Sequence, residues 1–255
     1  MDVLPVFGRC CYAIALIAFG LRQIVSLSFV RLVPGVPSWM PWPVAWAGST
    51  GIILAGVGWA ILVGRRAQLA AMLAGIFFLL LFVFLYVPQI IGNPLAGFVW
   101  TNPCKTLALL GAALWLAEHR IDSAGVSFAE IRLTHRLRPL GWIFLSVFLV
   151  VCGVQHFVYA GFVDTLVPAW IPPGPRFWTC FSGIALVVGG LGLALPKTAR
   201  LAAMLVGIMI FLWVILLHIP LTAEKKSLFE FDGIFEALAL SGAAFLLVGR
   251  RKTTG

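Results

Sequence analysis

The sequence predicts an all-α integral membrane protein of about eight transmembrane helices, arranged as two tandem parallel four-helix bundles. Three observations predict this fold: an apolar composition, eight long apolar segments and an internal repeat. Of the 255 residues, 62% are hydrophobic and only 11% are charged, whereas a soluble domain carries about 25% charged residues. A water-soluble fold could not bury this much apolar sequence, so lipid must solvate much of the chain.

Eight segments are long and apolar enough to cross the hydrocarbon core, which takes roughly 20 residues of helix. They span about 9–30, 44–63, 68–87, 99–117, 140–162, 177–195, 198–217 and 232–248. Their apolar runs are continuous rather than alternating, which excludes a β-barrel. The N-terminus, MDVLPVFGRCC, lacks the basic start and the cleavage pattern of a signal peptide. We therefore expect the first segment to be retained as a helix.

The basic residues predict the orientation, because Lys and Arg concentrate in cytoplasmic loops. Twelve of them belong to the termini and the even-numbered connections, against four in the odd-numbered connections. We therefore expect both termini in the cytoplasm and the protein in the bacterial cytoplasmic (inner) membrane. These loops also explain the net charge of +9, and no basic patch indicates nucleic-acid binding. The twelve are Arg9, Arg65, Arg66, Arg120, Arg132, Arg136, Arg138, Lys197, Arg200, Arg250, Arg251 and Lys252, and the four are Arg31, Arg176, Lys225 and Lys226.

An internal repeat divides the chain into two halves. Four stretches recur in the same order with an offset of about 132 residues: 36–41 (VPSWMP) with 167–172 (VPAWIP), 69–76 (LAAMLAGI) with 201–208 (LAAMLVGI), 86–88 (YVP) with 218–220 (HIP), and 107–113 (LALLGAA) with 238–244 (LALSGAA). Four helices is an even number, so both copies enter from the same side and the repeats are parallel. We assign residues 1–118 and 139–255 to the two units. Residues 119–138 form a charged cytoplasmic linker, in which we expect a short surface helix.

Each repeated unit resembles the DoxX family of bacterial four-helix membrane proteins. The resemblance rests on 20–23 (GLRQ) and 153–157 (GVQHF), on the Pro/Trp loop 167–175 (VPAWIPPGP), and on 105–111 (KTLALLG) at the start of a fourth helix. It implies a four-helix bundle in the cytoplasmic membrane. Relatives include subunits of a thiosulfate:quinone oxidoreductase, a methylamine-utilisation maturation protein and a cargo receptor of the early secretory pathway. A quinone cofactor and a redox partner subunit are therefore implied by the resemblance alone.

Polar residues gather in the outer third of the predicted bilayer, as judged by the 1.5 Å rise per residue from the cytoplasmic helix ends. The repeat pairs Lys105 with Glu236. A charge in hydrocarbon costs about 2.5–3.5 kcal/mol on insertion scales, so such residues face the bundle interior or water. We predict a polar ligand-binding pocket that opens to the outer face beneath the Pro/Trp loops. Its predicted residues are Arg22, Gln23, Tyr86, Lys105, Gln155, His156, His218 and Glu236.

Simpler interpretations stand beside the pocket. Arg22 and Lys105 can snorkel to the interface, or pair with Glu236 in a structural ion pair that catalyses nothing. The tryptophans of the Pro/Trp loops suit interfacial anchoring, with a lid over a lipid-like ligand as the alternative. Simple solvation in outer loops explains four acidic residues. These are Asp164, Glu224, Glu230 and Asp232.

The sequence favours an accessory or small-amphiphile-binding membrane component, with a quinone-linked redox subunit as one version. It contains no catalytic motif, so we assign no catalytic residue. His156, His218 and Glu236 lack metal-ligand spacing, and none of the five cysteines forms a CxxC pair, so we predict no metal site and no redox-active thiol pair. One alternative is a membrane enzyme that uses His156 and Glu236 in acid–base chemistry on an apolar substrate. A small-solute transporter ranks last, because transporter sites lie near the midplane beside broken helices.

Overall fold

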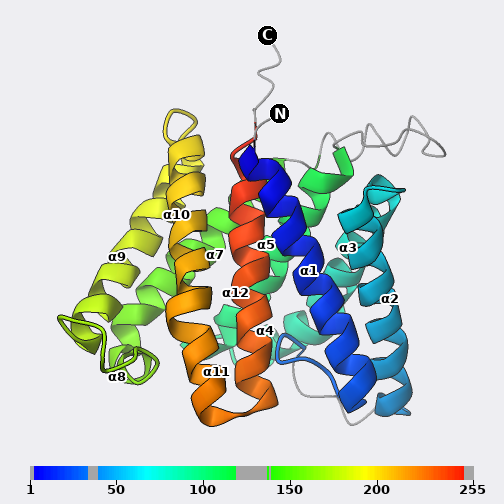
Figure 1. The fold of residues 1–255 in the computed structure, drawn as a ribbon, viewed down its shortest axis with the longest axis horizontal. Coiled ribbons are helices and arrows are strands. Elements are labelled where there is room, and N and C mark those ends of the chain that lie inside the picture. Colours follow the sequence, from blue (N-terminus) through cyan, green and yellow to red (C-terminus); the bar gives the residue numbers. More distant parts are fainter. Residues whose placement is uncertain (1–2, 34–39, 119–136, 138, 250–255) are drawn as a thin grey trace.

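The computed structural model describes residues 3–33, 40–118, 137 and 139–249, and within them every regular element is a helix (Figure 1). The helices of the first half are α1 (Val3–Ser26), α2 (Pro43–Val63), α3 (Ala67–Leu81), the π-helical η1 (Phe82–Tyr86), α4 (Val87–Gly92), the 3₁₀-helical η2 (Gly97–Trp100) and α5 (Thr101–Glu118). Those of the second half are α7 (Pro139–Val158), α8 (Ala160–Asp164), α9 (Pro175–Ala194), α10 (Ala199–Trp213), the π-helical η3 (Val214–His218), α11 (Ile219–Lys225) and α12 (Leu228–Leu247).

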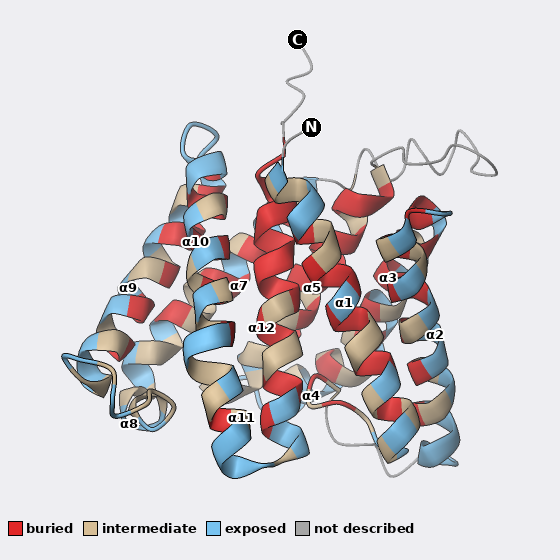
Figure 2. Ribbon diagram, viewed as in Figure 1, coloured by how far each residue is buried: buried red, intermediate tan, exposed pale blue. Residues whose placement is uncertain are grey.

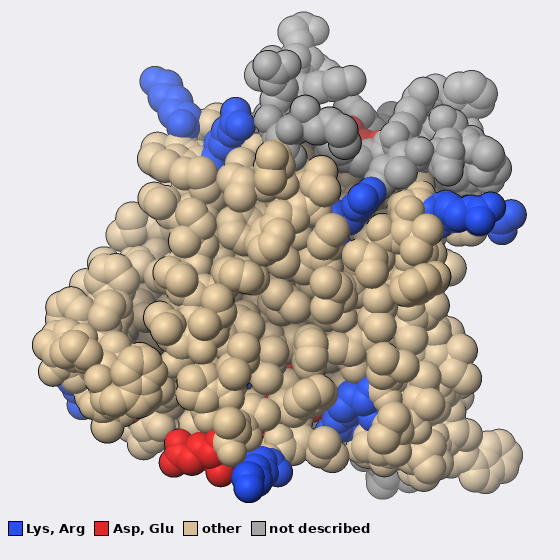
Figure 3. All heavy atoms as spheres, in the orientation of Figure 1, with Lys and Arg blue, Asp and Glu red and all other residues tan. Residues whose placement is uncertain are grey.

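Six helices of the described chain are long and apolar enough to cross a membrane, so the protein is a multi-pass membrane protein. They are α1, α2, the continuous α3–η1–α4, α7, α9 and the continuous α10–η3–α11. The remaining two predicted spans coincide with α5 and α12, which carry more polar residues near their first turns. On the face seen in Figure 3, Lys, Arg, Asp and Glu lie mainly at the two ends of the molecule, and a wide uncharged band separates them.

The two polar helices, α5 and α12, lie at the centre of the molecule. α12 packs against α1, α5 and α10, and α5 packs against α3, α7 and α12. Most of their residues are buried, whereas the outer helices expose many large apolar side chains (Figure 2). Lipid can solvate those exposed side chains, so the burial pattern is that of a membrane protein whose centre is more polar than its periphery.

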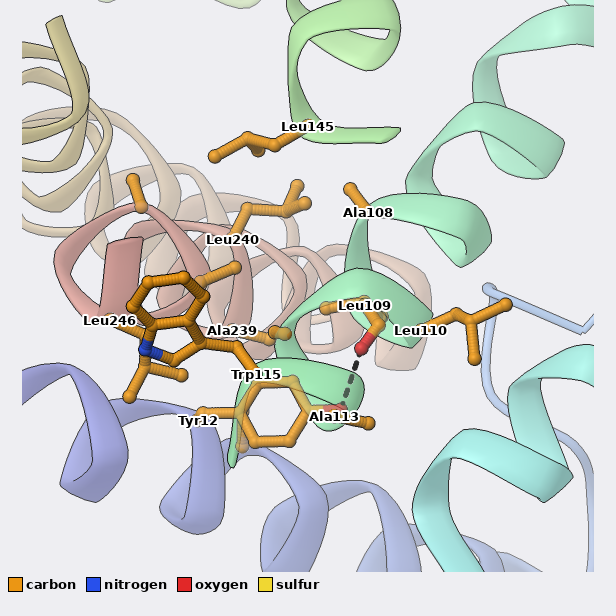
Figure 4. Packing of buried hydrophobic residues seen from close by; sticks show 14 of the residues in the cluster. Tyr12, Ala108, Leu109, Leu110, Ala113, Trp115, Leu145, Ala239, Leu240 and Leu246 are labelled. Atoms are coloured by element: carbon orange, nitrogen blue, oxygen red, sulfur yellow. Dashed lines mark hydrogen bonds between the residues drawn. The ribbon is translucent and has the colours of Figure 1, made fainter. Parts of the chain in front are cut away.

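An apolar core joins the central helices (Figure 4). Tyr12 of α1, Trp115 of α5, Leu145 of α7 and Leu240 of α12 are all buried within one cluster. The Tyr12 hydroxyl donates a 2.9 Å hydrogen bond to the Leu109 carbonyl oxygen, which links α1 to α5. The core therefore connects the two halves of the chain rather than filling each half separately.

Glycines bring the central helices into backbone contact. A Cβ added to Gly8 would lie 2.7 Å from the carbonyl oxygen of Gly242, where α1 meets α12. A Cβ added to Gly111 would lie 2.8 Å from the Cα of Gly141, where α5 meets α7. Small residues allow such approach in membranes, where close packing replaces the hydrophobic effect as the force that holds helices together. The repeat alignment pairs Gly8 with Gly141 and Gly111 with Gly242.

The two π-helical segments also occupy aligned positions, and each precedes a proline. Pro88 and Pro220 have no N–H to donate within a helix, which disturbs the regular bonding of the preceding turn. The backbone N–H of Val87 instead bonds the carbonyl of Phe82, and that of Ile219 bonds the carbonyl of Val214. These bonds span five residues, which defines a π-turn.

Several helix ends differ from the sequence prediction. α1 begins at Val3 rather than near residue 9, and the helices through α4 and α11 run several residues further than predicted. α12 begins at Leu228 rather than near residue 232. The prediction that Glu230 and Asp232 lie in a solvated loop was therefore wrong, because both belong to α12 and are buried. The predicted surface helix in the linker falls on residues outside the described part of the chain.

Candidate functional site

Glu236 of α12 holds two cations inside the bundle, in the half of the molecule opposite the termini. Its Oε2 atom accepts a 2.6 Å bond from Nζ of Lys105 on α5 and a 2.8 Å bond from Nη2 of Arg31. Its Oε1 atom accepts a 3.2 Å bond from Nε of Arg31, so the Arg31 contact is bidentate. Bidentate guanidinium–carboxylate pairs combine charge with fixed geometry. An ion pair of Lys105 or Arg22 with Glu236 was one alternative drawn from the sequence; the structure forms the Lys105 pair, and the sequence did not predict Arg31 as the third partner.

Asp232 lies one helical turn before Glu236 and is also buried. Its Oδ2 atom accepts a 2.7 Å bond from the backbone N–H of Arg31. Its Oδ1 atom lies 3.1 Å from Nε of Arg22, near the end of α1. The first three turns of α12 therefore present two carboxylates to a segment that follows α1. We call Arg22, Arg31, Lys105, Asp232 and Glu236 the ion cluster.

Arg31 reaches the cluster because residues 27–33, which we call the strap, turn inward after α1. Val30 and Leu32 are buried on either side of Arg31. Nη1 of Arg22 donates to the carbonyl oxygens of Ser28 and Phe29, at 2.9 and 2.8 Å. These bonds satisfy carbonyl groups that no helix satisfies, which is the requirement for burying irregular backbone at membrane depth.

Tyr86 and His218 complete the surroundings of the cluster, each from the end of a π-helical segment. The Tyr86 hydroxyl donates a hydrogen bond to the carbonyl oxygen of Leu32 in the strap. A Cβ added to Gly233 would lie 3.2 Å from both His218 Nδ1 and Arg31 Nη2, so glycine leaves the space that these groups occupy. The structure thus brings Arg22, Tyr86, Lys105, His218 and Glu236, five of the eight predicted site residues, to one place.

Arg31 stays charged in this setting. Three carboxylates act on its guanidinium, those of Glu236, Glu230 and Asp232, and an arginine side chain does not lose its proton in proteins. Its guanidinium carbon also lies 4.5 Å from the ring centroid of Phe229, a cation–π distance. Charge and ring together fix the orientation of Arg31.

The other three predicted site residues have different partners. The Gln23 amide oxygen accepts a 2.9 Å bond from Thr50 of α2. Gln155 accepts a 2.7 Å bond from the Thr101 hydroxyl and donates to the Gly97 carbonyl at 2.7 Å. His156 uses Nδ1 to bond the Cys152 carbonyl at 2.8 Å, and its ring stacks on Trp213 of α10. His156 and Glu236 therefore engage separate sets of residues.

Aligned positions in the two halves carry different chemistry. Arg22 and Asp232 form an ion pair between α1 and α12. Their aligned counterparts, Gln155 and Thr101, form a neutral hydrogen bond between α7 and α5. The ionic network thus occupies one of two equivalent helix junctions.

Sequence reasoning missed Arg31 and Asp232, although one signal pointed to Asp232. The stretch 227–230 (SLFE) has the S-x-x-E pattern of a capping box, which marks a helix start. In the structure the Ser227 hydroxyl accepts a 3.2 Å bond from the Glu230 N–H. That pattern places Asp232 inside the helix, one turn from Glu236. No pattern of this kind indicates that the strap turns inward.

The described residues contain no group of three or more His, Cys, Asp or Glu side chains placed to hold a metal ion. All five cysteines are free thiols. The chemistry available in the ion cluster is therefore that of ammonium, guanidinium, carboxylate and hydroxyl groups.

Fold and site together define a multi-pass α-helical membrane protein with an ion cluster between its central helices. A family model described as a domain of unknown function (DUF8561) matches residues 145–229, about a third of the chain. The matched part contains His156 and His218 but ends before Asp232 and Glu236. No match was found among the curated proteins or among the solved structures.

Proposed function

We propose that this protein is an accessory membrane component that binds a small amphiphile at the ion cluster. The observation that carries the proposal is the cluster itself: five charged side chains meet inside an otherwise apolar bundle. Buried ion pairs add little net stability compared with apolar packing. Intramembrane charges commonly mark the path or the site of a ligand. The strap and the aromatic rings beside the cluster supply apolar surface for a tail.

The proposed topology has eight spans, with α5 and α12 as the two central ones and both termini in the cytoplasm of a bacterial inner-membrane protein. The N-terminus and the C-terminal end of α12 lie at one end of the molecule (Figure 1). The α2–α3 connection, with Arg65 and Arg66, and the α9–α10 connection, with Lys197, lie at that same end, and Arg200 stands in the first turn of α10. Positive charge at the end with the termini supports the proposal that this end faces the cytoplasm. In that orientation the ion cluster lies in the outer half of the bilayer.

A tandem duplication of a DoxX-like unit is the proposed origin of the two halves. Three correspondences support it. The π-helical segment η1 corresponds to η3. The contact between Gly8 and Gly242 corresponds to the contact between Gly141 and Gly111, and the Arg22–Asp232 pair corresponds to the Gln155–Thr101 pair. The first correspondence relates two π-helical segments, the second two close glycine contacts, and the third two polar contacts between helices. The DoxX resemblance adds a quinone as one amphiphile to test and a redox subunit as one partner to seek.

The geometry favours binding over acid–base catalysis by His156 and Glu236. General acid–base partners must lie within hydrogen-bond reach of the same reacting atom. The Glu236 carboxylate forms ion pairs with Lys105 and Arg31. The His156 ring forms a hydrogen bond with the Cys152 carbonyl and stacks on Trp213. The ion cluster is therefore the better supported site.

The experiment is to purify the protein in a mild detergent and identify retained amphiphiles by native mass spectrometry and by extraction followed by chromatography. We expect one species, quinones included in the search, to be enriched over its share of the membrane. Lys105→Met should reduce that enrichment, whereas Lys197→Met, at an exposed loop far from the cluster, should not. A lipid profile identical to that of the bulk membrane for the wild type would reject the proposal.

A further inference from the structure

We infer that the amphiphile bound at the ion cluster carries an anionic head group, such as a carboxylate or a phosphate monoester. This inference rests on the proposed function and adds the chemical class of the ligand. It follows from four features of the cluster: its net positive charge, the lower burial of its cations, the hydrogen-bond donors left on them, and the apolar surface next to it.

The net charge of the cluster is positive. Three cations, Arg22, Arg31 and Lys105, face the two carboxylates of Asp232 and Glu236, while the nearby Glu230 carboxylate is balanced by its own ion pair with Lys225. One positive charge is therefore uncompensated among side chains that lie inside the bundle. An uncompensated charge at membrane depth is costly, and a bound anion would balance it.

The cations are the least buried side chains of the ion cluster. The side chains of Arg22, Lys105 and Arg31 are 10%, 12% and 19% exposed, whereas those of Asp232 and Glu236 are 1% and 3% exposed. Figure 3 shows Lys or Arg atoms in the lower part of the otherwise uncharged band, with only specks of Asp or Glu beside them. A ligand that approaches the cluster meets ammonium and guanidinium groups first.

Hydrogen-bond donors remain available on those cations. An ammonium group has three N–H donors and a guanidinium has five. Within the described part of the chain, Lys105 Nζ bonds only Glu236 Oε2, and the guanidinium of Arg31 uses Nε and Nη2 on Glu236. Arg31 Nη1 and two Lys105 N–H groups are therefore left for acceptor oxygens of a ligand.

An aromatic surface adjoins the cationic one. The rings of Phe229 and Phe231 are exposed, and Arg31 lies over the first of them. Phe231 packs edge-on against Phe235, with ring centroids 5.0 Å apart. These rings lie along α12 beside the ion cluster, so an alkyl or isoprenoid tail can lie against them while its head group contacts Lys105 and Arg31.

The test compares three probes that share a twelve-carbon tail: dodecyl phosphate, dodecanol and dodecyltrimethylammonium. Binding to the purified full-length protein is measured by native mass spectrometry and by isothermal titration calorimetry. We expect dodecyl phosphate to bind about tenfold or more tightly than dodecanol, since one charge-assisted hydrogen bond is worth that ratio. Dodecyltrimethylammonium should bind more weakly than dodecanol. Inorganic phosphate should compete only at high concentration, because it lacks the tail.

Two variants with opposite effects separate charge from folding. Lys105→Met removes one cation and should weaken dodecyl phosphate binding about tenfold while leaving dodecanol binding unchanged. Glu236→Gln keeps the shape, adds one net positive charge and should tighten dodecyl phosphate binding. If both variants weaken binding of all probes alike, the cluster is structural and the inference is wrong.

The outcomes also separate this inference from the proposed function. Equal binding of the three probes would overturn the anionic head group and leave amphiphile binding intact. Binding of none of them, together with the absence of any retained species in the wild type, would reject both.

Discussion

Lys105 and Glu236 occupy aligned positions in the two halves of the chain, and their charged atoms lie 2.6 Å apart. Two identical residues at these positions would repel each other or remain uncharged. Opposite charges instead join α5 to α12 at the centre of the molecule. The two halves therefore differ at the point where they meet, and each half supplies one charge of the pair.

Glu236→Ala should destabilise the protein by about 3–5 kcal/mol, because it leaves Lys105 and Arg31 without a carboxylate in a buried site. Unfolding in a series of detergent and SDS mixtures measures the change in free energy. Glu224→Ala, at an exposed position of α11, is the matched control and should change the free energy of unfolding by less than about 0.5 kcal/mol. Similar effects for the two variants would mean that water solvates Lys105 and Arg31 once the carboxylate is removed.

Asp232→Asn should loosen the strap, because a neutral amide weakens the bonds to the Arg31 N–H and to Arg22. In a cysteine-free background, Val30→Cys reports this opening, since Val30 is 2% exposed. We expect a maleimide to label that cysteine about tenfold faster when Asp232→Asn is also present, the ratio for one charge-assisted hydrogen bond.

Asn retains the shape of Asp, so the labelling rate tests the charge rather than the packing. Ser49→Cys, at an exposed position of α2, should label at the same rate with and without Asp232→Asn. Unchanged labelling at position 30 would mean that Val30 and Leu32 hold the strap through burial alone.

The membrane helices could be predicted from the sequence because continuous apolar runs are a strong signal at this length. The pairing of Lys105 with Glu236 followed from the repeat, which places equivalent residues at equivalent depth. Asp232 was misplaced because the last span was predicted to begin only at about residue 232, next to an outer loop. Ser227 caps α12, so the helix begins at Leu228 and Asp232 lies within it rather than in a loop.

The role of Arg31 could not be predicted for a different reason. The strap has no regular secondary structure, so no periodicity indicates which way its side chains point. Its inward path depends on hydrogen bonds to Arg22, at the end of the preceding helix, and to Tyr86, which is 54 residues from its partner Leu32 along the chain. Such tertiary bonds leave no pattern in a single sequence.

Gly111→Ala should destabilise the protein by about 1–3 kcal/mol, because the added methyl group meets the backbone of Gly141 and forces α5 and α7 apart. Gly56→Ala is the matched control on α2, where a Cβ meets nothing within 4 Å. Alanine favours helix over glycine, so the control should be neutral or stabilising by up to about 1 kcal/mol. Thermal unfolding of the purified variants measures both effects, and equal melting temperatures would show that the α5–α7 contact can relax.

Labelling of two lysine positions tests the orientation, on which the outer location of the ion cluster depends. Lys197 lies between α9 and α10, and Lys226 lies between α11 and α12, at the opposite end of the molecule; both are exposed. In a cysteine-free background, Lys226→Cys should react with a membrane-impermeant maleimide in intact cells. Lys197→Cys should react only after the membrane is permeabilised, because positive loops stay in the cytoplasm. The reverse pattern would place the ion cluster near the cytoplasm, where an anionic head group would have to come from the inner leaflet.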